Sequence, residues 1–177
     1  MKHLILVLTT FLMALSASAQ HEPSLPLGSP APDFTAADTL GVNHSLSDYA
    51  NALVVVDFWA SWCGDCRREM PALKQLYEDY CECGVEFVSV SFDESEASWK
   101  AYLRKQELPW LQISNLQPWH SKVDGVSTTT NPIAKAYDLK WIPTLFLVDH
   151  GTIIAYDTTV ERFEEKLRQR IEMKVEE

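Results

Sequence analysis

Residues 53–66 read LVVVDFWASWCGDC, and this stretch decides the fold. Its first part, Leu53 to Ala60, is a continuous β-branched and aromatic run, which is typical of a strand covered on both faces. From Cys63 to about Cys81, apolar residues recur at helical spacing. The two cysteines of the CGDC motif are therefore expected where a buried strand ends and a helix begins.

The rest of the chain predicts an α/β domain around this strand and helix. A small hairpin is expected to turn near Gly41, and Gly84 occupies the position of a helix C-cap. Further patterns follow in the order strand 85–92, helix 93–106, strand 110–114, helix 132–137, strands 144–148 and 153–156, and helix 158–171. This order predicts an α/β layered fold with a central mixed sheet flanked by helices, which ends in an antiparallel pair.

Some details of this assignment rest on local signals. Asp93 with Glu96, and Thr158 with Glu161, have the spacing of capping boxes at two helix starts. The least regular stretch is 115–131, in which residues 127–130 are expected to form a loop. No repeat or internal linker is visible, so a single domain is expected.

The N-terminus has the pattern of a secretory signal peptide. Lys2 supplies a positive start, residues 4–15 are apolar apart from two threonines, and residues 17–19 form a small-x-small cleavage site. A membrane anchor needs about 20 apolar residues, and this run is shorter. We therefore expect a signal peptide over 1–19, a mature domain over 20–177 with an extension and hairpin over 20–51, and export to an oxidising compartment.

Length and charge exclude several classes of protein. The chain has 177 residues, a formal net charge of −10 and 46% hydrophobic residues. That length supports a self-sufficient core, and the apolar content excludes a disordered chain. The acidic balance leaves no basic stripe for a nucleic-acid backbone, so no nucleic-acid partner is expected.

Cys63 and Cys66 carry the chemistry that the pattern indicates. Cysteines three residues apart in a first helical turn face the same way, within reach of a disulfide. The helix N-terminus favours a thiolate at Cys63, and a second thiol can resolve a mixed disulfide. A structural bridge is the alternative, but so short a loop adds little stability. Arg67 stands where c-type haem attachment requires histidine.

Two motifs resemble the thioredoxin fold. Residues 56–66 follow the active-site strand and helix start of thioredoxins, and residues 141–144 (WIPT) follow the cis-proline segment of that family. The apolar leader, the GSPAPDF opening at 28–34 and the hairpin make the chain similar to the TlpA/ResA-like exported thiol–disulfide oxidoreductases. The resemblance implies a thioredoxin-like fold with an N-terminal β-hairpin extension.

The resemblance implies a role for each matching residue. Cys63 is expected to be the nucleophile and Cys66 the resolving thiol, joined as a disulfide when oxidised. Pro143 is expected to be cis and to lie across from Cys63, with the Ile142 backbone pairing with an extended substrate. Glu94 matches a carboxylate that ResA-like proteins place near the cysteines, and an acid stabilised by a helix start is the other interpretation.

Asp57, Trp62 and Trp141 are further candidates for the site. Asp57 is a carboxylate in an otherwise apolar strand, so burial is expected to raise its pKa and let it exchange a proton with Cys66. An aspartate at a wet strand edge is the alternative. Trp62 and Trp141 are expected to flank the disulfide as apolar substrate contacts, although aromatic packing explains them equally well.

Two features depart from the family pattern or are not explained by it. Asp65 stands where related motifs usually carry proline, and its charge opposes a Cys63 thiolate, so we expect a less acidic Cys63 than in a proline-bearing variant. A second pair, Cys81 and Cys83, lies about 22 Å from Cys66 along the helix. It is interpreted as a local bridge, or as one buried and one exposed thiol, with an inert or structural role.

Together these features predict an exported, periplasmic thiol–disulfide oxidoreductase. It is expected to reduce protein disulfides with electrons from a thiol donor, and the resemblance also implies a part in cytochrome c maturation. No cofactor, bound metal or membrane span after signal cleavage is expected. A peroxiredoxin-like peroxidase is one alternative, but Ala60 stands where a peroxidase needs a hydroxyl residue. A zinc module using all four cysteines is another, but the helix separates the two pairs.

Overall fold

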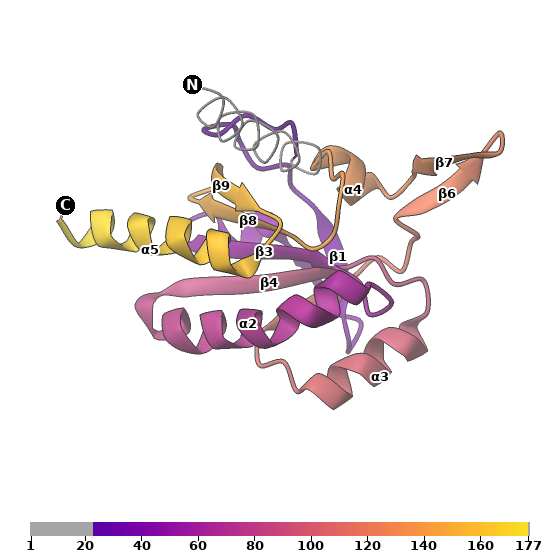
Figure 1. Cartoon of the computed structure of the whole chain (residues 1–177), viewed down its shortest axis with the longest axis horizontal. Helices are drawn as coiled ribbons and strands as arrows, with labels where there is room; N and C mark the ends of the chain where they lie inside the picture. Colours follow the sequence, from indigo (N-terminus) through magenta and orange to yellow (C-terminus); the bar gives the residue numbers. More distant parts are fainter. Residues whose placement is uncertain (1–22, 177) are drawn as a thin grey trace, which may run out of the picture.

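A seven-stranded sheet forms the centre of the fold (Figure 1). The structure is a computed structural model that describes residues 23–176, so the predicted signal peptide over 1–19 lies outside the described residues. The strands lie in the order β2-β1-β5-β4-β3-β8-β9. Their bounds are β1 Thr35–Asp38, β2 Asn43–Ser45, β3 Leu53–Trp59, β4 Val85–Ser91, β5 Leu111–Ser114, β8 Thr144–Asp149 and β9 Thr152–Asp157.

The sheet is mixed, as the sequence predicts. β3, β4 and β5 are parallel, whereas β8, β9, β1 and β2 each join their neighbours antiparallel. β1 and β2 form the predicted N-terminal hairpin, in which Gly41 takes a φ of 83° that favours glycine. The Asp38 carboxylate stabilises this turn by accepting hydrogen bonds from the backbone N–H groups of Leu40 and Val42.

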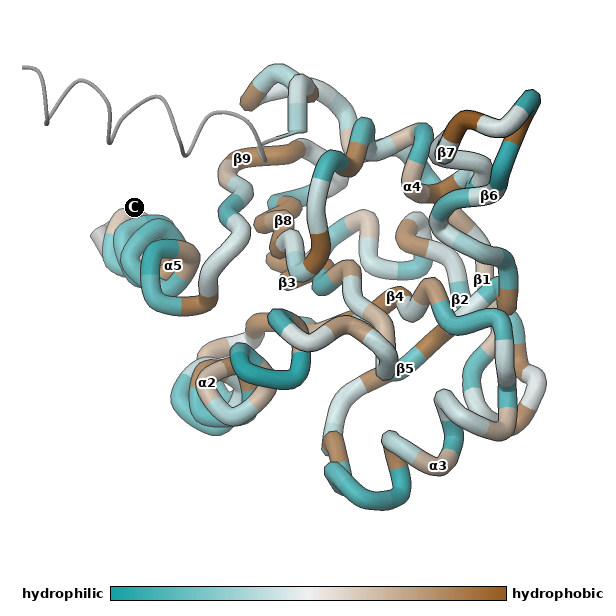
Figure 2. Tube along the Cα trace, turned by 45° about the vertical axis from the view of Figure 1, so that its right-hand side comes forward, coloured by the Kyte–Doolittle hydropathy of each residue, from teal (hydrophilic) through white to brown (hydrophobic). Residues whose placement is uncertain are grey.

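Helices cover both faces of the sheet (Figures 1 and 2). Their bounds are α2 Gly64–Tyr80, α3 Glu96–Gln106, α4 Pro132–Ala136 and α5 Val160–Glu176, with short 3-10 turns η1 Leu46–Tyr49 and η2 Cys81–Cys83. β3, β4 and β5 follow one another in one direction across the sheet, so right-handed crossovers place α2 and α3 on the same face. α5 packs beside α2, and α4 covers the opposite face. None of the helices between residues 23 and 176 is long and apolar enough to cross a membrane.

β3 connects the core to the site. All seven of its residues are buried, which confirms the strand expected over this apolar run. Phe58 packs against Tyr137, next to α4, with ring centroids 4.7 Å apart. Because side chains alternate along a strand, the neighbouring Asp57 points to the opposite face, which α2 covers. The strand thus places one carboxylate beneath the helix that carries both cysteines of the motif.

α2 confirms the predicted helix and adds one feature. Cys63 is its N-cap, and after η2 the chain turns at Gly84 with a φ of 77°. Pro71 lies inside the helix. Proline has no N–H group, so the carbonyl of Arg67 receives no helical hydrogen bond from residue 71.

The expectation of a loop over 127–130 is wrong. Residues 120–129 form a two-stranded hairpin of β6 (His120–Val123) and β7 (Val126–Thr129), separate from the main sheet. Asp124 and Gly125 form its turn with φ values of 52° and 81°. An Asp-Gly pair is a strong hairpin signal, but the flanking residues are mostly polar and gave no apolar alternation.

The predicted caps are also wrong in detail. The N-cap of α3 is Ser95, whose hydroxyl accepts from the Ser98 N–H, and Asp93 is used elsewhere. At the start of α5, the Val160 N–H donates to Glu69 of α2. The carboxylate of Asp157 accepts from the N–H groups of the two residues before Val160. At α3 the cap lies two residues after the predicted one, and at α5 the carboxylates of Asp157 and the distant Glu69 replace the predicted capping box.

Candidate functional site

Cys63 and Cys66 form a disulfide at the point where β3 passes into α2. Their Cα atoms lie 5.3 Å apart, and both residues are buried. The backbone N–H of Cys66 donates to Cys63 Sγ at 3.1 Å, so this sulfur occupies the N-cap position of the helix. Free N–H groups and the positive end of the helix dipole favour negative charge on that atom. This geometry is consistent with Cys63 as the nucleophile, and that role stays a prediction.

A cis proline lies beside this disulfide. The Ile142–Pro143 peptide bond is cis, which confirms the expectation from the WIPT motif. The Ile142 carbonyl oxygen lies 3.5 Å from Cys63 Sγ, although the two residues are 79 positions apart. Pro143 directly precedes β8, and Thr144 fastens the segment by donating from its hydroxyl to the Trp141 carbonyl at 2.8 Å. The predicted juxtaposition of Cys63 with the proline segment is thus present.

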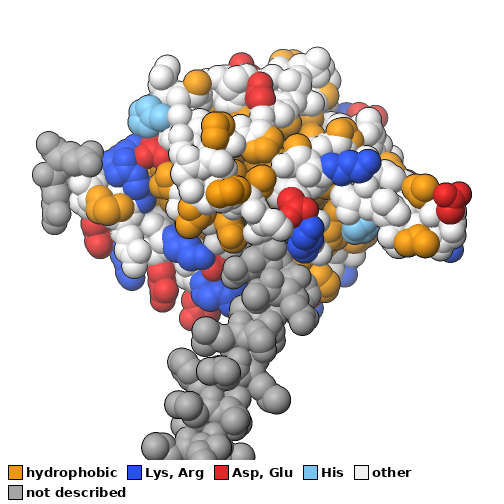
Figure 3. Space-filling model, turned by 90° about the horizontal axis from the view of Figure 1, so that it is seen from above, with side chains coloured by type: hydrophobic (Ala, Val, Ile, Leu, Met, Phe, Trp, Pro, Cys, Tyr) orange, Lys and Arg blue, Asp and Glu red, His pale blue; other side chains and the backbone are white. Residues whose placement is uncertain are grey.

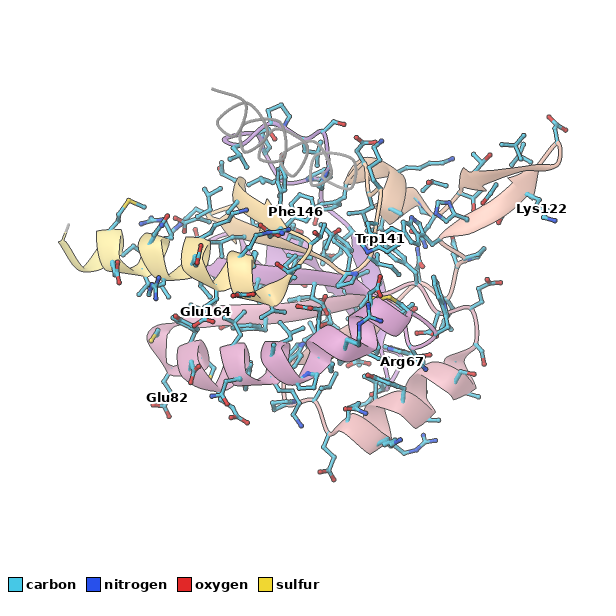
Figure 4. The ribbon with its side chains drawn as sticks, viewed as in Figure 1. Arg67, Glu82, Lys122, Trp141, Phe146 and Glu164 are labelled. Carbon is cyan, nitrogen blue, oxygen red and sulfur yellow. A yellow bond between two sulfur atoms is a disulfide. The ribbon has the colours of Figure 1, made fainter. Side chains whose placement is uncertain are left out.

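Three tryptophans surround the disulfide. Trp62, Trp119 and Trp141 line a recess of about 290 Å³ together with Cys63 and Ile142. Trp62 and Trp141 are 54% and 40% exposed, whereas Trp119 is buried. Figure 4 labels Trp141 and Arg67 at the N-terminal end of α2. Trp119 gave no signal in the sequence, because it lies in a stretch without a strand pattern.

Asp57 is buried beneath the site, as predicted. Its carboxylate accepts a hydrogen bond from the Ser89 hydroxyl at 2.8 Å, and Ser89 in turn accepts one from Trp110 Nε1 at 2.8 Å. Burial raises the pKa of Asp57 to about 7, while the Ser89 hydrogen bond acts in the opposite direction. A carboxyl group with this pKa can both accept and release a proton near neutral pH. Ser89 and Trp110 gave no signal in the sequence, because they approach Asp57 only across the sheet.

A second buried carboxylate holds the loop before the motif. Asp93 accepts from the Ser61 N–H at 2.8 Å, the Ser61 hydroxyl at 2.6 Å and the Ser91 hydroxyl at 2.6 Å. It therefore ties the end of β4 to the loop that leads from β3 into α2. This position explains why Asp93 does not cap α3. Its role was not predicted, since it depends on a contact between residues 32 positions apart.

Charged residues lie on the other side of the motif. Asp65 forms an ion pair with Arg68 one turn along α2, which partly neutralises the charge expected to oppose a Cys63 thiolate. Both line a polar recess of about 430 Å³ that also includes Pro143 and Arg162. The predicted effect of Asp65 on the acidity of Cys63 stays a prediction.

The remaining candidate residues are Glu94, Cys81 and Cys83. Glu94 is exposed just before Ser95, and its role in the site stays a prediction. Cys81 and Cys83 are free thiols in η2 at the far end of α2, one half-buried and one exposed. Between residues 23 and 176, no three His, Cys, Asp or Glu side chains converge into a group that could hold a metal ion.

Comparisons with known proteins agree on one kind of protein. A profile described as the AhpC/TSA family matches residues 27–157. A thiol-disulfide oxidoreductase ResA from Geobacillus kaustophilus is 30% identical over 149 residues, which cover 84% of this chain and 78% of that protein. ResA from Bacillus subtilis is 29% identical over 126 residues, which cover 71% and 63% of the two chains.

Solved structures are similar over the same part of the chain. The thioredoxin domain of a thiol-disulfide oxidoreductase from Bacteroides vulgatus is 29% identical with a TM-score of 0.70, covering 84% of this chain and 99% of that domain. A thiol:disulfide interchange protein DsbE from Chlorobium tepidum is 27% identical with a TM-score of 0.70 and the same two coverages.

Proposed function

Because the chain belongs to the AhpC/TSA family and is a thiol–disulfide oxidoreductase of the ResA-like, thioredoxin-fold kind, we propose that it reduces protein disulfides through Cys63 and Cys66. The observation that carries this proposal is the position of the disulfide. It lies at a helix N-terminus, with Cys63 Sγ 3.5 Å from the carbonyl that precedes a cis proline. A peroxidase site needs a hydroxyl residue three positions before its cysteine, where this chain has Ala60.

The proposed reaction begins with both cysteines reduced. The Cys63 thiolate attacks one sulfur of the client disulfide, forms a mixed disulfide and releases the first client thiolate. Cys66 then loses its proton and attacks Cys63 Sγ, and the second client thiolate leaves. The client gains two electrons and two protons as a dithiol, and the enzyme is left with the Cys63–Cys66 disulfide. A dithiol donor returns the enzyme to its reduced state by the reverse exchange.

We assign Asp57 as the base that receives the proton of Cys66. It lies on the face of β3 that α2 covers, and its pKa of about 7 suits proton transfer at neutral pH. Trp62, Trp141 and the Ile142 backbone are proposed to contact the client, because they line the recess around Cys63. Pro143 holds the Ile142 carbonyl in place, and Glu94 is proposed as a second carboxylate of the site.

Insulin reduction tests the proposal directly. The wild-type chain is expected to reduce insulin disulfides in the presence of a dithiol, and Cys63→Ser is expected to lower the rate to the uncatalysed background, roughly 10³-fold or more. Cys66→Ser is expected to accumulate a mixed disulfide with insulin through Cys63, detectable by mass. Equal rates for the wild type and Cys63→Ser would contradict the proposal.

The direction of the reaction has its own measurement. A reductase is expected to have a reduction potential near or below about −270 mV, whereas a strong oxidant lies near about −120 mV. Equilibration of the Cys63–Cys66 pair with a dithiol buffer gives this value. Asp65 in the first turn of α2 disfavours a negative sulfur nearby and so favours the disulfide form, as a reductase requires.

The place of action is part of the same proposal. We propose that residues 1–19 are a signal peptide that directs export across the inner membrane to the periplasm. One client process is cytochrome c maturation, in which the C-x-x-C-H cysteines must be thiols before haem attachment. Fractionation of cells together with N-terminal sequencing tests export, and a mature chain that begins at Gln20 is the expected result.

A further inference from the structure

The β6–β7 hairpin projects from the body of the molecule, as Figure 1 shows. Its two strands pair through four residue pairs, from His120 with Thr129 to Val123 with Val126. They join no strand of the main sheet, so the outer edge of each strand offers unpaired backbone groups. Lys122, labelled in Figure 4, lies out along this arm. We refer to residues 120–129 as the arm.

The base of the arm is fixed next to the disulfide. The Trp119 carbonyl accepts a hydrogen bond from the Thr130 N–H at 3.0 Å, which closes the hairpin. Asn131, buried at the start of α4, donates from its amide to the Gln117 carbonyl at 3.0 Å. The Trp119 ring packs parallel to Phe92, with centroids 6.3 Å apart. A two-stranded hairpin alone is marginally stable, so these anchors set the direction of the arm relative to the site.

The arm is mostly polar, and its tip carries two exposed apolar side chains. Val123 and Val126, which face each other at the tip, are 48% and 65% exposed. Leu116, on the segment that leads to the arm, is also exposed. Figure 3 shows apolar side chains on the projection and on the neighbouring surface. Lys122 and Asp124 carry opposite charges, so neither sign of charge dominates the arm.

This surface continues the one around the disulfide. Trp62 and Trp141 are exposed beside Cys63, and Trp119 both lines their recess and forms the base of the arm. A four-residue strand spans about 13 Å. An extended client segment that leaves Cys63 along the arm therefore reaches the two valines after about four or five residues. Along this path it leaves the apolar recess, follows an open strand edge and reaches the two valines at the tip.

We propose that the arm binds the extended, apolar polypeptide segment that flanks the client's reactive cysteine, so that this site prefers protein and long peptide disulfides over small-molecule disulfides. The proposal rests on the proposed function, because it extends the client surface around Cys63. The client segment adds as a strand along one edge of the arm, through backbone hydrogen bonds. The valines at the tip contact its apolar side chains.

Peptide length is the variable that tests the proposal. The reduced protein, freed of reductant, is mixed with one of two symmetric peptide disulfides, and a single turnover is followed by tryptophan fluorescence. The short peptide carries one residue on each side of its cysteine, and the long peptide carries six apolar residues on each side. We expect the wild type to react about tenfold faster with the long peptide at limiting concentration.

Val123→Thr/Val126→Thr is the informative variant. Threonine keeps the β-branched shape that suits a strand and replaces a methyl group by a hydroxyl, so the arm is expected to persist. The rate with the long peptide is expected to fall about three- to tenfold, since two apolar contacts are lost, while the rate with the short peptide stays unchanged. Leu40→Thr/Val42→Thr is the matched control, because these exposed residues lie at the β1–β2 turn near the start of β5, whereas the arm follows the end of β5.

Each outcome has a defined meaning. An unchanged preference for the long peptide in Val123→Thr/Val126→Thr, or an equal loss with both peptides, overturns the assignment of the arm. Sedimentation gives a second test. If the wild type is a dimer and Val123→Thr/Val126→Thr is a monomer, a second copy of the chain covers the valines, and the assignment of the arm to a client is overturned. A wild type that reduces neither peptide contradicts the proposed function itself, which is a separate failure.

Discussion

The two cysteine pairs of this chain lie at opposite ends of one helix. Cys63 and Cys66 are at the N-terminus of α2, buried and joined as a disulfide. Cys81 and Cys83 follow its C-terminus in η2 as free thiols. Cys63 Sγ accepts from a backbone N–H and lies 3.5 Å from the carbonyl that precedes the cis proline, and the neighbouring strand β3 carries the buried Asp57. At the second pair, both sulfurs lie 4.0 Å from backbone carbonyl oxygens.

The two pairs differ in their spacing, C-x-x-C against C-x-C, and also in the backbone groups that surround them. A helix presents N–H donors at one end and carbonyl acceptors at the other, and only donors stabilise a negative sulfur. The first pair also lies where two buried strands, a loop and a proline segment converge. The second pair lies at a helix end, where Cys83 is exposed to solvent. Exchange chemistry is thus expected at the first pair alone.

The largest expected effect is the difference in insulin-reduction rate between variants of the two cysteine pairs. Cys81→Ser/Cys83→Ser is expected to reduce insulin within about twofold of the wild-type rate, because neither thiol approaches the client surface, against the loss of roughly 10³-fold for Cys63→Ser. Thiol labelling of the native, oxidised protein is expected to modify Cys81 and Cys83 and to spare the first pair. If the oxidised protein takes up no label, the second pair has also formed a bridge.

Asp57→Asn removes the carboxylate that only the first pair has. The rate of the resolving step is expected to fall about 10²-fold, because the side-chain amide of the variant cannot accept the proton of Cys66. In the wild type this rate is expected to rise with pH through about 7, the pKa of Asp57, and the variant is expected to lose that limb of the profile. A pH profile of single-turnover release of the mixed disulfide measures both effects. An identical profile in the variant would remove Asp57 from the mechanism.

The same carboxylate affects stability, with a defined sign. Its pKa is about 7 in the folded protein and about 3.9 in the unfolded chain, so the folded state binds more protons between these two pH values. The contribution of Asp57 to the free energy of unfolding therefore falls as pH rises from about 4 to 7, by roughly 4 kcal/mol. Asp57→Asn does not titrate, so its stability relative to the wild type is expected to rise over that window. Thermal unfolding of both oxidised proteins across the range checks this sign.

Ser89→Ala is expected to have the smallest effect of the series. The variant removes the hydroxyl that donates to Asp57, and the pKa of Asp57 is expected to rise further, because that hydrogen bond favours the charged form. The alkaline shift of the pH profile is the readout, since a loss of packing alone would lower the rate without moving the profile. Trp110→Phe, which removes the donor to Ser89, is expected to shift the profile less.

The sequence predicted the parts of the site that are local in the chain. The apolar run of β3, the CGDC motif at the start of α2 and the cis proline before β8 each carry their signal within a few residues. Asp57 was visible for the same reason, as a charge inside an apolar strand. The mixed sheet followed from the order of strand and helix patterns, which right-handed crossovers reduce to few topologies.

The residues that were missed act across the fold. Ser89, Trp110 and Asp93 make their contacts between neighbouring strands or loops, and no spacing in the sequence reveals such pairs. The arm was missed because its strands are polar and short, so the turn at Asp124 and Gly125 was the only available signal. An isolated hairpin has no buried face and therefore no apolar alternation to detect.

Pro71 weakens the connection between the first turn of α2, which carries the active-site motif, and the rest of that helix. The carbonyl of Arg67 receives no helical hydrogen bond, so the ladder of α2 is interrupted directly after the turn that holds Cys63 and Cys66. Fraying of residues 64–67 breaks one backbone hydrogen bond fewer than in an uninterrupted helix, a difference of about 1 kcal/mol. The first turn of α2 is therefore expected to open at a lower cost in free energy than a turn of an uninterrupted helix.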